Sequence, residues 1–307
     1  MLQRIGGQPD LMNLSTLTGM VRQTIRQGIG MAPMFALMFI CLTVSPVQQF
    51  MGQRNFVQAD ISPNIDPERP LPSPEQFARL CQNDVLQALE MSLLRYDREV
   101  AEYLCTMVKK ERINGIDRPE ETIRCAFRQK PFSVLMQWLK GQDKADASLF
   151  VEGENSEHVL IRPSGFKGSL VGYVERPTND KEVIEASRYS VHEFGLERGS
   201  RRTLNAWREN QKQDRFFVEY LGEKIIPEVG NRPCYVIKRT CNPPEEEGMT
   251  EITIMLDKET WLQVGSVLKC GEQLIGSYYF KDIQLKPTFS PHQFRPETVK
   301  KPGLEKK

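Results

Sequence analysis

The feature that most constrains the fold is a series of short segments in which every second residue is apolar, each separated from the next by turn residues. Residues 103–109 and 123–127 show this period on either side of a turn-rich stretch at 114–119. A period of two is typical of strands with one buried face, so we expect a β-hairpin here. Further strands are expected at residues 132–138, 149–152, 159–162, 169–175, 217–221, 234–240, 250–256, 262–270 and 274–285.

Helical segments precede and interrupt these strands. Ser73 suits the N-cap of a helix that we expect over residues 74–95, whose apolar stripe is broken only by Asp84. Two more helices are expected at 180–188 and 196–212. Single strands and helices do not alternate, as a parallel sheet would require. The order therefore predicts an α+β fold, in which a strongly curved antiparallel sheet forms a half-open barrel wrapped round a few helices.

An apolar run at residues 29–44, preceded by Arg22 and Arg26, has the layout of an export signal. The run is shorter than the roughly 20 residues that span a bilayer, which favours a cleaved signal peptide. An uncleaved inner-membrane anchor, with both arginines on the cytoplasmic side, is the alternative. Both interpretations place the rest of the chain in the periplasm or cell envelope. The expected boundaries are 1–47 for the signal peptide or anchor, 48–73 for a proline-rich linker, 74–295 for a single curved-sheet domain and 296–307 for a charged tail.

The charge balance narrows the choice of partners. A net charge of +1 over 307 residues argues against a nucleic-acid partner, which would select for a basic stripe. The basic clusters at 109–112, 198–202 and 300–307 are interrupted by acids, glycine or proline, and we interpret them as solvated surface. Membrane contact is expected only through the N-terminal segment, if that segment stays uncleaved.

The cysteines are consistent with export. Of seven cysteines, Cys41 lies inside the apolar run and six remain in the rest of the chain. Cys105 and Cys125 flank the turn-rich stretch and would face each other across the expected hairpin, which makes them the best candidates for a disulfide. The alternative is that both are small buried apolar residues.

Several segments occur along the chain in a characteristic order, namely Tyr103–Thr106, Lys110–Gly115, Lys130–Val134, Val151–Gly153, Arg188–Val191, Phe194–Gly195, Arg232–Ile237, Leu256–Thr260 and Tyr278–Ile283. In this order they resemble an exported family common in planctomycetes, domain-of-unknown-function family 1571. Residues 254–265 are also similar to the lipoprotein carriers of the bacterial periplasm, in which a strand ends in Asp, turns through a short polar loop and resumes. This second resemblance implies an unclosed, lipoprotein-carrier-like barrel around helices, with an apolar cavity for acyl chains.

The sequence carries little that indicates catalysis. The three histidines fall in different expected elements, and no serine-nucleophile, phosphate-loop or zinc-protease motif is present. The glycines at 165 and 168 read as a hairpin turn, because a phosphate loop would need a strand before it and a helix after it. The carboxylates at 120–121 and 245–247 lie beside prolines and read as exposed charge. We expect that the protein is not an enzyme and that it has neither a cofactor nor a metal site.

Binding is the function class that the sequence favours. A curved sheet that its own side chains do not fill leaves an apolar cavity, and Phe127, Phe132, Met136 and Trp138 are the residues we expect to line it. The alternative is that the same residues are simply core. The first hypothesis is an exported envelope protein that binds or carries an acyl lipid or lipoprotein. The second is a non-catalytic structural or interaction module that meets envelope proteins through its surface, and an exported hydrolase is a third.

Overall fold

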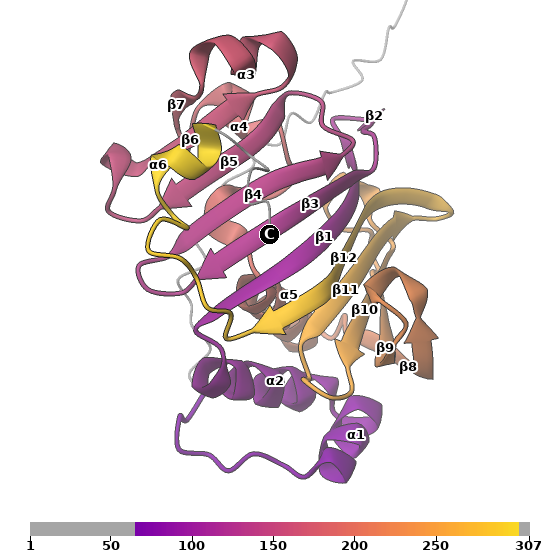
Figure 1. Ribbon diagram of the computed structural model, residues 1–307. Coiled ribbons are helices and arrows are strands. Elements are labelled where there is room, and N and C mark those ends of the chain that lie inside the picture. The colour runs from indigo at the N-terminus through magenta and orange to yellow at the C-terminus, as the bar shows by residue number, and fades with distance from the viewer. Residues whose placement is uncertain (1–64, 301–307) are drawn as a thin grey trace, which may run out of the picture. The chain divides into compact units, whose positions relative to one another are not determined.

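The computed structural model describes residues 65–300, and the expected signal segment and most of the expected linker lie outside this range. Twelve strands form one antiparallel sheet in the order β7-β6-β5-β4-β3-β1-β12-β11-β10-β9-β8, with β2 paired to β1 (Figure 1). The path ends at β7 on one side and β8 on the other, so the barrel is not closed. The α+β class and the open antiparallel sheet are thus confirmed.

The expected alternation is clearest in β1, whereas several other strands, among them β4, β9 and β10, bury three or more consecutive residues because both of their faces are covered. Within β1 the burial alternates without interruption from Glu102 to Lys109. The strands are β1 (Glu102–Ile113), β2 (Ile116–Asp117), β3 (Glu121–Arg128), β4 (Ser133–Lys140), β5 (Ala145–Val151), β6 (His158–Pro163), β7 (Val174–Pro177), β8 (Phe217–Ile226), β9 (Arg232–Thr240), β10 (Glu251–Asp257), β11 (Gln263–Cys270) and β12 (Gln273–Leu285).

The first expected helix is two helices. Asp84 ends the first of them and caps the second, where its carboxylate accepts a hydrogen bond from the Gln87 amide at 3.1 Å. The expectation of one continuous helix is therefore wrong, and the residue that interrupts the apolar stripe is the one that breaks the helix. The helices are α1 (Pro74–Asn83), α2 (Val85–Glu99), α3 (Gly165–Val171), α4 (Lys181–Ile184), α5 (Leu196–Lys212) and α6 (Pro296–Lys300), and short 3₁₀ turns lie at 155–157, 191–193, 227–229 and 246–248.

Helix α5 begins and ends where the sequence predicts, and it lies against the sheet (Figure 1). The Tyr103 hydroxyl on β1 accepts a hydrogen bond from the Leu196 amide at 3.1 Å, which holds the start of the helix on the sheet. Gly195 precedes the helix with φ +127°, and a Cβ there would lie 3.2 Å from that hydroxyl. Further along α5, Leu204 and Trp207 are fully buried together with residues of α1 and α2.

The opposite face of β3 to β6 is covered by the C-terminal segment. Val299 of α6 is fully buried, and it packs with Leu135, Leu149 and Leu160 from the strands. The first residues of the expected charged tail are therefore part of the packed domain.

Three sequence expectations differ from the structure between β6 and α5. The segment expected as a hairpin turn is the start of α3, and the strand expected at 169–175 begins only at Val174. Helix α4 is also shorter than the expected 180–188. Within the described residues, the structure contains no helix whose length and hydropathy would let it cross a membrane.

Candidate ligand-binding cavity

A cavity of about 1250 Å³ lies between one face of the sheet and the chain that covers it. The sheet side is formed by β1, β3, β4, β5 and β6, joined by β11 and β12. The covering side is formed by residues 182–194 and the first half of α5. Most of the lining surface is apolar, and the apolar side chains of the sheet include Met107, Ile123, Met136, Trp138, Ile161 and Phe280.

The register of the sheet brings these side chains together. Met107 pairs with Ile123, and Ile123 pairs in turn with Trp138. A second row runs from Met136 to Ser148 on β5 and on to Ile161 on β6. Because paired residues in a sheet share a face, each row presents its side chains to the same cavity.

The structure separates the four residues predicted to line a cavity into two pairs. Met136 and Trp138 line it and are half-buried. Phe127 and Phe132 do not line it and are fully buried in the adjoining core, with their rings 5.5 Å apart and edge to face. Tyr103 stacks on Phe127 at 4.7 Å. The core interpretation therefore describes the phenylalanines, and the cavity interpretation describes the other two.

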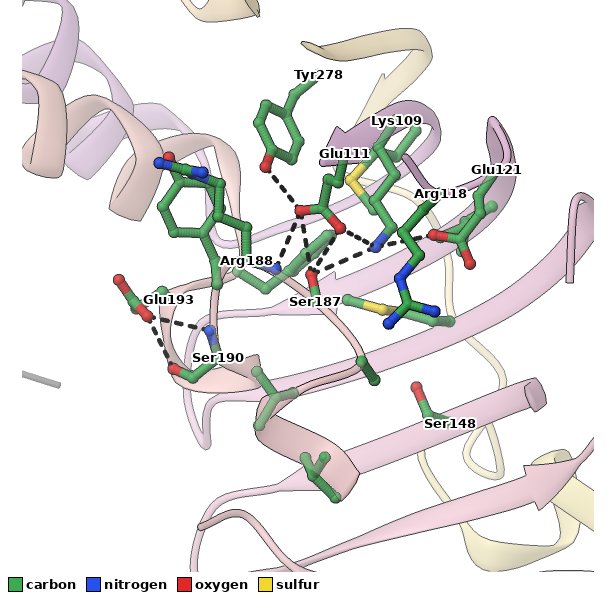
Figure 2. A pocket seen from close by; sticks show the side chains of 18 of the residues that line it. Lys109, Glu111, Arg118, Glu121, Ser148, Ser187, Arg188, Ser190, Glu193 and Tyr278 are labelled. Carbon is green, nitrogen blue, oxygen red and sulfur yellow. Dashed lines mark hydrogen bonds and ion pairs between the residues drawn. The ribbon is translucent and has the colours of Figure 1, made fainter. Parts of the chain in front are cut away.

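A buried ionic cluster forms one wall of the cavity, as Figure 2 shows. Lys109 Nζ lies 2.8 Å from Glu111 Oε2 and 2.8 Å from Glu121 Oε2. The Tyr278 hydroxyl donates to Glu111 Oε1 at 2.6 Å. Trp138 joins the cluster because its indole Nε1 donates to Glu121 Oε1 at 2.7 Å.

The loop before α5 closes this cluster from the other side. The Arg188 amide donates to Glu111 Oε1 at 3.2 Å, and Lys109 Nζ donates to the Ser187 hydroxyl at 3.3 Å. The Arg188 guanidinium, itself buried, forms an ion pair with Glu247. Hydrogen bonds thus join the β1 wall of the cavity to residues 187–188 of the segment that covers it.

Ionisation of the cluster follows from its contacts. Burial on its own would lower the pKa of Lys109, but the two carboxylates outweigh it and the pKa is raised. Burial would likewise raise the pKa of Glu111, but the Lys109 charge and the hydrogen bonds from Lys109, Tyr278 and Arg188 outweigh it, and the pKa is lowered. Both groups are therefore charged at neutral pH. A protonated amine is a poor nucleophile and an ionised carboxylate a poor proton donor, so the pair is suited to fixing a polar group in place.

The sequence interpretation missed this cluster. Residues 109–112 were expected to be solvated, whereas Lys109 is 6% and Glu111 4% exposed. Two other groups of carboxylates were interpreted as exposed charge, but Glu121 pairs with Lys109 and Glu245 pairs with the fully buried Arg239 at 2.7 Å. The signal was present in the alternation, because Lys109 falls on the same face as the buried residues before it.

Cys105 and Cys125 lie directly opposite each other in the register of β1 and β3, as the hairpin predicts. Both are buried, and all six cysteines of the described chain are free thiols in this structure. The hydrogen bond with Cys125 and burial raise the pKa of Cys105 well above its ordinary value. A buried thiol with a raised pKa reacts slowly, and the disulfide between Cys105 and Cys125 stays a prediction.

The histidines do not come together in the cavity. The His192 ring stands edge to face on Phe150 at 4.7 Å, and His158 Nδ1 lies 2.8 Å from the Ser156 carbonyl oxygen. Burial and the nearby Arg198 lower the pKa of His192. Over residues 65–300 no group of three or more His, Cys, Asp or Glu side chains is arranged to hold a metal ion.

By its fold and its site, the protein is an α+β protein whose open antiparallel sheet carries a large, mainly apolar cavity on one face. The chain belongs to the family described as "Protein of unknown function (DUF1571)", whose model matches residues 100–301. This membership confirms the family resemblance seen in the sequence. The comparison with curated proteins found no match.

Several solved structures are similar over most of their length. A DUF1329 family protein from Desulfovibrio piger has 10% identity and a TM-score of 0.34, covering 71% of this chain and 100% of that chain. Lipoprotein LppX of Mycobacterium tuberculosis has 11% identity and a TM-score of 0.37, covering 68% and 99%. A domain from Vibrio parahaemolyticus, provisionally described as an outer membrane lipoprotein-sorting protein, has 11% identity and a TM-score of 0.26, covering 69% and 98%. Because these TM-scores lie below 0.5, we base no functional argument on them.

Proposed function

We propose that this protein binds an acyl chain, as a lipid or as part of a lipoprotein, in the cavity between the sheet and α5. The observation that carries the proposal is the cavity itself, about 1250 Å³ in volume with a mainly apolar lining. Pockets that bury small-molecule ligands are about 300–1,000 Å³. A space of this size leaves room for one or more flexible chains.

The contrast between neighbouring side chains supports this use of the space. Phe127 and Phe132 are fully buried by protein atoms, so the core next to the cavity is tightly packed. Met136, Trp138 and Ile161 lie on the same sheet and remain half-buried because they face the cavity. An acyl chain would cover them and gain about 25 cal/mol for each Å² of apolar surface removed from water.

The ionic cluster gives the cavity a polar wall. Lys109, Glu111 and Glu121 are held by one another and by Tyr278, so they offer fixed charges without needing to rearrange. A ligand that has an apolar chain and a polar end matches a cavity with both kinds of wall. Export, argued from the apolar run at 29–44, places this activity in the cell envelope, where acyl lipids and lipoproteins are abundant.

The test is to fill the cavity without disturbing its walls. Ser148 projects into the space from β5 (Figure 2). A Cβ added at Gly199 of α5, which also lines the cavity, would meet only the Arg202 guanidinium, at 4.0 Å. We expect Ser148→Phe and Gly199→Leu to weaken the binding of cis-parinaric acid, a fluorescent fatty acid, about tenfold or more, or about 1.4 kcal/mol.

Ser290→Phe is the matched control, because it adds the same ring at an exposed position. It should bind the probe as the parent does. All variants should keep the parent's circular dichroism spectrum and melting temperature within a few degrees. Equal probe binding by the parent, Ser148→Phe and Gly199→Leu would contradict an acyl-binding role for the cavity.

A further inference from the structure

We propose that α3 is a membrane-docking element, which places the rim of the cavity against a lipid surface. This inference rests on the proposed function for its purpose, since a docked rim would let an acyl chain enter without crossing water. The docking itself depends on different residues from those that fill the cavity, so the two can fail separately.

The main observation is an exposed apolar surface on a short helix. Phe166 is 82% exposed, Leu170 75% and Val171 54%, and all three lie at the rim of the cavity. Phe166 and Leu170 are four residues apart, so they share one side of the helix. Large apolar side chains gathered on a soluble surface mark an interaction site more often than chance exposure.

The position of α3 is fixed by backbone contacts, so the exposure is not the result of a loose end. Gly168 lies so close to β6 that a Cβ there would be 1.9 Å from the Pro163 carbonyl oxygen. At the start of the helix, the Ser164 hydroxyl donates to the Asp143 carbonyl oxygen at 2.8 Å. The helix is held by its backbone on one side and presents its apolar side chains on the other.

The charges around α3 favour a lipid surface over water. Lys144 and Arg176 line the same rim, and Lys300 Nζ lies 5.5 Å from the Tyr173 ring beside the end of α3. In the described part of the chain, none of these three cations forms an ion pair with a carboxylate. A basic residue near an anionic bilayer contributes about 1 kcal/mol to binding.

The acids nearby do not cancel this effect. Asp143 and Asp146 face arginines, Arg118 at 3.7 Å and Arg162 at 3.8 Å. Glu182 remains at the rim, so we expect the apolar contacts to supply most of the affinity and the cations to add a dependence on anionic lipid. A helix with this composition suits the interface of a membrane better than it suits solvent.

The test reads out contact between α3 and acyl chains directly. Leu170→Trp in the full chain places a fluorophore on the proposed docking face, and brominated phosphatidylcholine vesicles with and without phosphatidylglycerol supply the quencher. We expect additional quenching beyond that of the parent's own tryptophans, greater when phosphatidylglycerol is present and reduced by salt.

Ile225→Trp is the matched control. Ile225 is 60% exposed on β8, the edge strand at the other end of the sheet. Its tryptophan should show no additional quenching even if the N-terminal segment tethers the chain to the vesicle. Equal quenching at 170 and 225, or none at either, would overturn the docking proposal. So would self-association that Phe166→Ser/Leu170→Ser abolishes while vesicles have no effect, since a second copy would then be the partner.

Parinaric acid binding by the same variants separates this proposal from the function it serves. Probe binding at parental strength without quenching at 170 would mean that docking fails and the cavity function stands. Quenching at 170 without probe binding would mean the reverse.

Discussion

Lys109 and Glu111 lie two residues apart on β1 and share one face of the strand, with Nζ and Oε2 2.8 Å apart and both side chains almost fully buried. Two oppositely charged groups on one buried face would be costly alone. Here Glu121, from the neighbouring strand, completes the charge pairing, and Tyr278 satisfies a further oxygen. The buried face of β1 therefore begins with apolar residues and ends with an ion pair, and neither buried charge is left unpaired.

Glu111→Gln should destabilise the protein by about 3 kcal/mol near neutral pH, because it leaves Lys109 buried with one carboxylate instead of two. The pKa of Glu111 is lowered from its ordinary value of 4.5, so the unfolded chain takes up its proton first as the pH falls. The stability that Glu111 contributes is complete above about 4.5 and is lost between that value and the lower folded pKa. The variant should lack this part of the acid dependence. Urea unfolding at a series of pH values measures it, with the exposed Glu272→Gln as control.

Phe132→Ala should lower the free energy of unfolding by about 3–5 kcal/mol, because the ring is fully buried between other aromatic rings. Met136→Ala, on the same strand, should cost clearly less, because Met136 faces the cavity and its removal enlarges an existing space. Chemical denaturation of both variants compares the two sites. Similar losses at 132 and 136 would mean that the cavity is packed like the core.

Cys105 and Cys125 should become linked when the chain is exported to an oxidising compartment, because the register places them opposite each other. Peptide mapping without reduction should find the two cysteines in one linked peptide. Cys105→Ala should remove the linked peptide and leave the other buried cysteines as free thiols. Finding both as free thiols in exported protein would return them to the role of packing residues.

Asp84→Ala should lower stability by about 1 kcal/mol, because Asp84 caps α2 through the Gln87 amide. Asp84→Asn keeps an acceptor at the same position and should cost only a few tenths of that amount. Thermal unfolding of both variants tests the capping role. An alanine variant as stable as the asparagine variant would show that the chain breaks here for another reason.

Much of the fold could be predicted from local patterns. The alternation at 103–109 and 123–127 predicted the pairing of β1 with β3, and α5 spans the expected residues 196–212. Such patterns report which side of an element is buried, and one sheet with one covering helix leaves few other arrangements. Helix α3 was not predicted, because the two glycines at 165 and 168 were interpreted as turn residues. The structure shows another reason for Gly168: the helix lies so close to β6 that no side chain fits there.

The site could be predicted only in part, for a physical reason. Met136 and Trp138 lie where the alternation placed them, but which apolar residues face empty space depends on how far the covering chain stands from the sheet. The ionic cluster joins Lys109 to Ser187 and Tyr278, residues that are far apart in sequence and come together only through the sheet order. A charged residue on a buried face was the available signal, and it was interpreted as surface.

The most direct test of the central claim is native mass spectrometry of the full chain, expressed with its own N-terminus and purified without detergent. The account predicts a mass excess that matches an acyl lipid or lipopeptide in the parent and that is reduced or absent in Ser148→Phe. The apolar run at 29–44 has the same sequence in the parent and in Ser148→Phe, so a difference in their loading reports the cavity. An unloaded parent that stays unloaded after incubation with phospholipid, or equal loading of the two proteins, would contradict it.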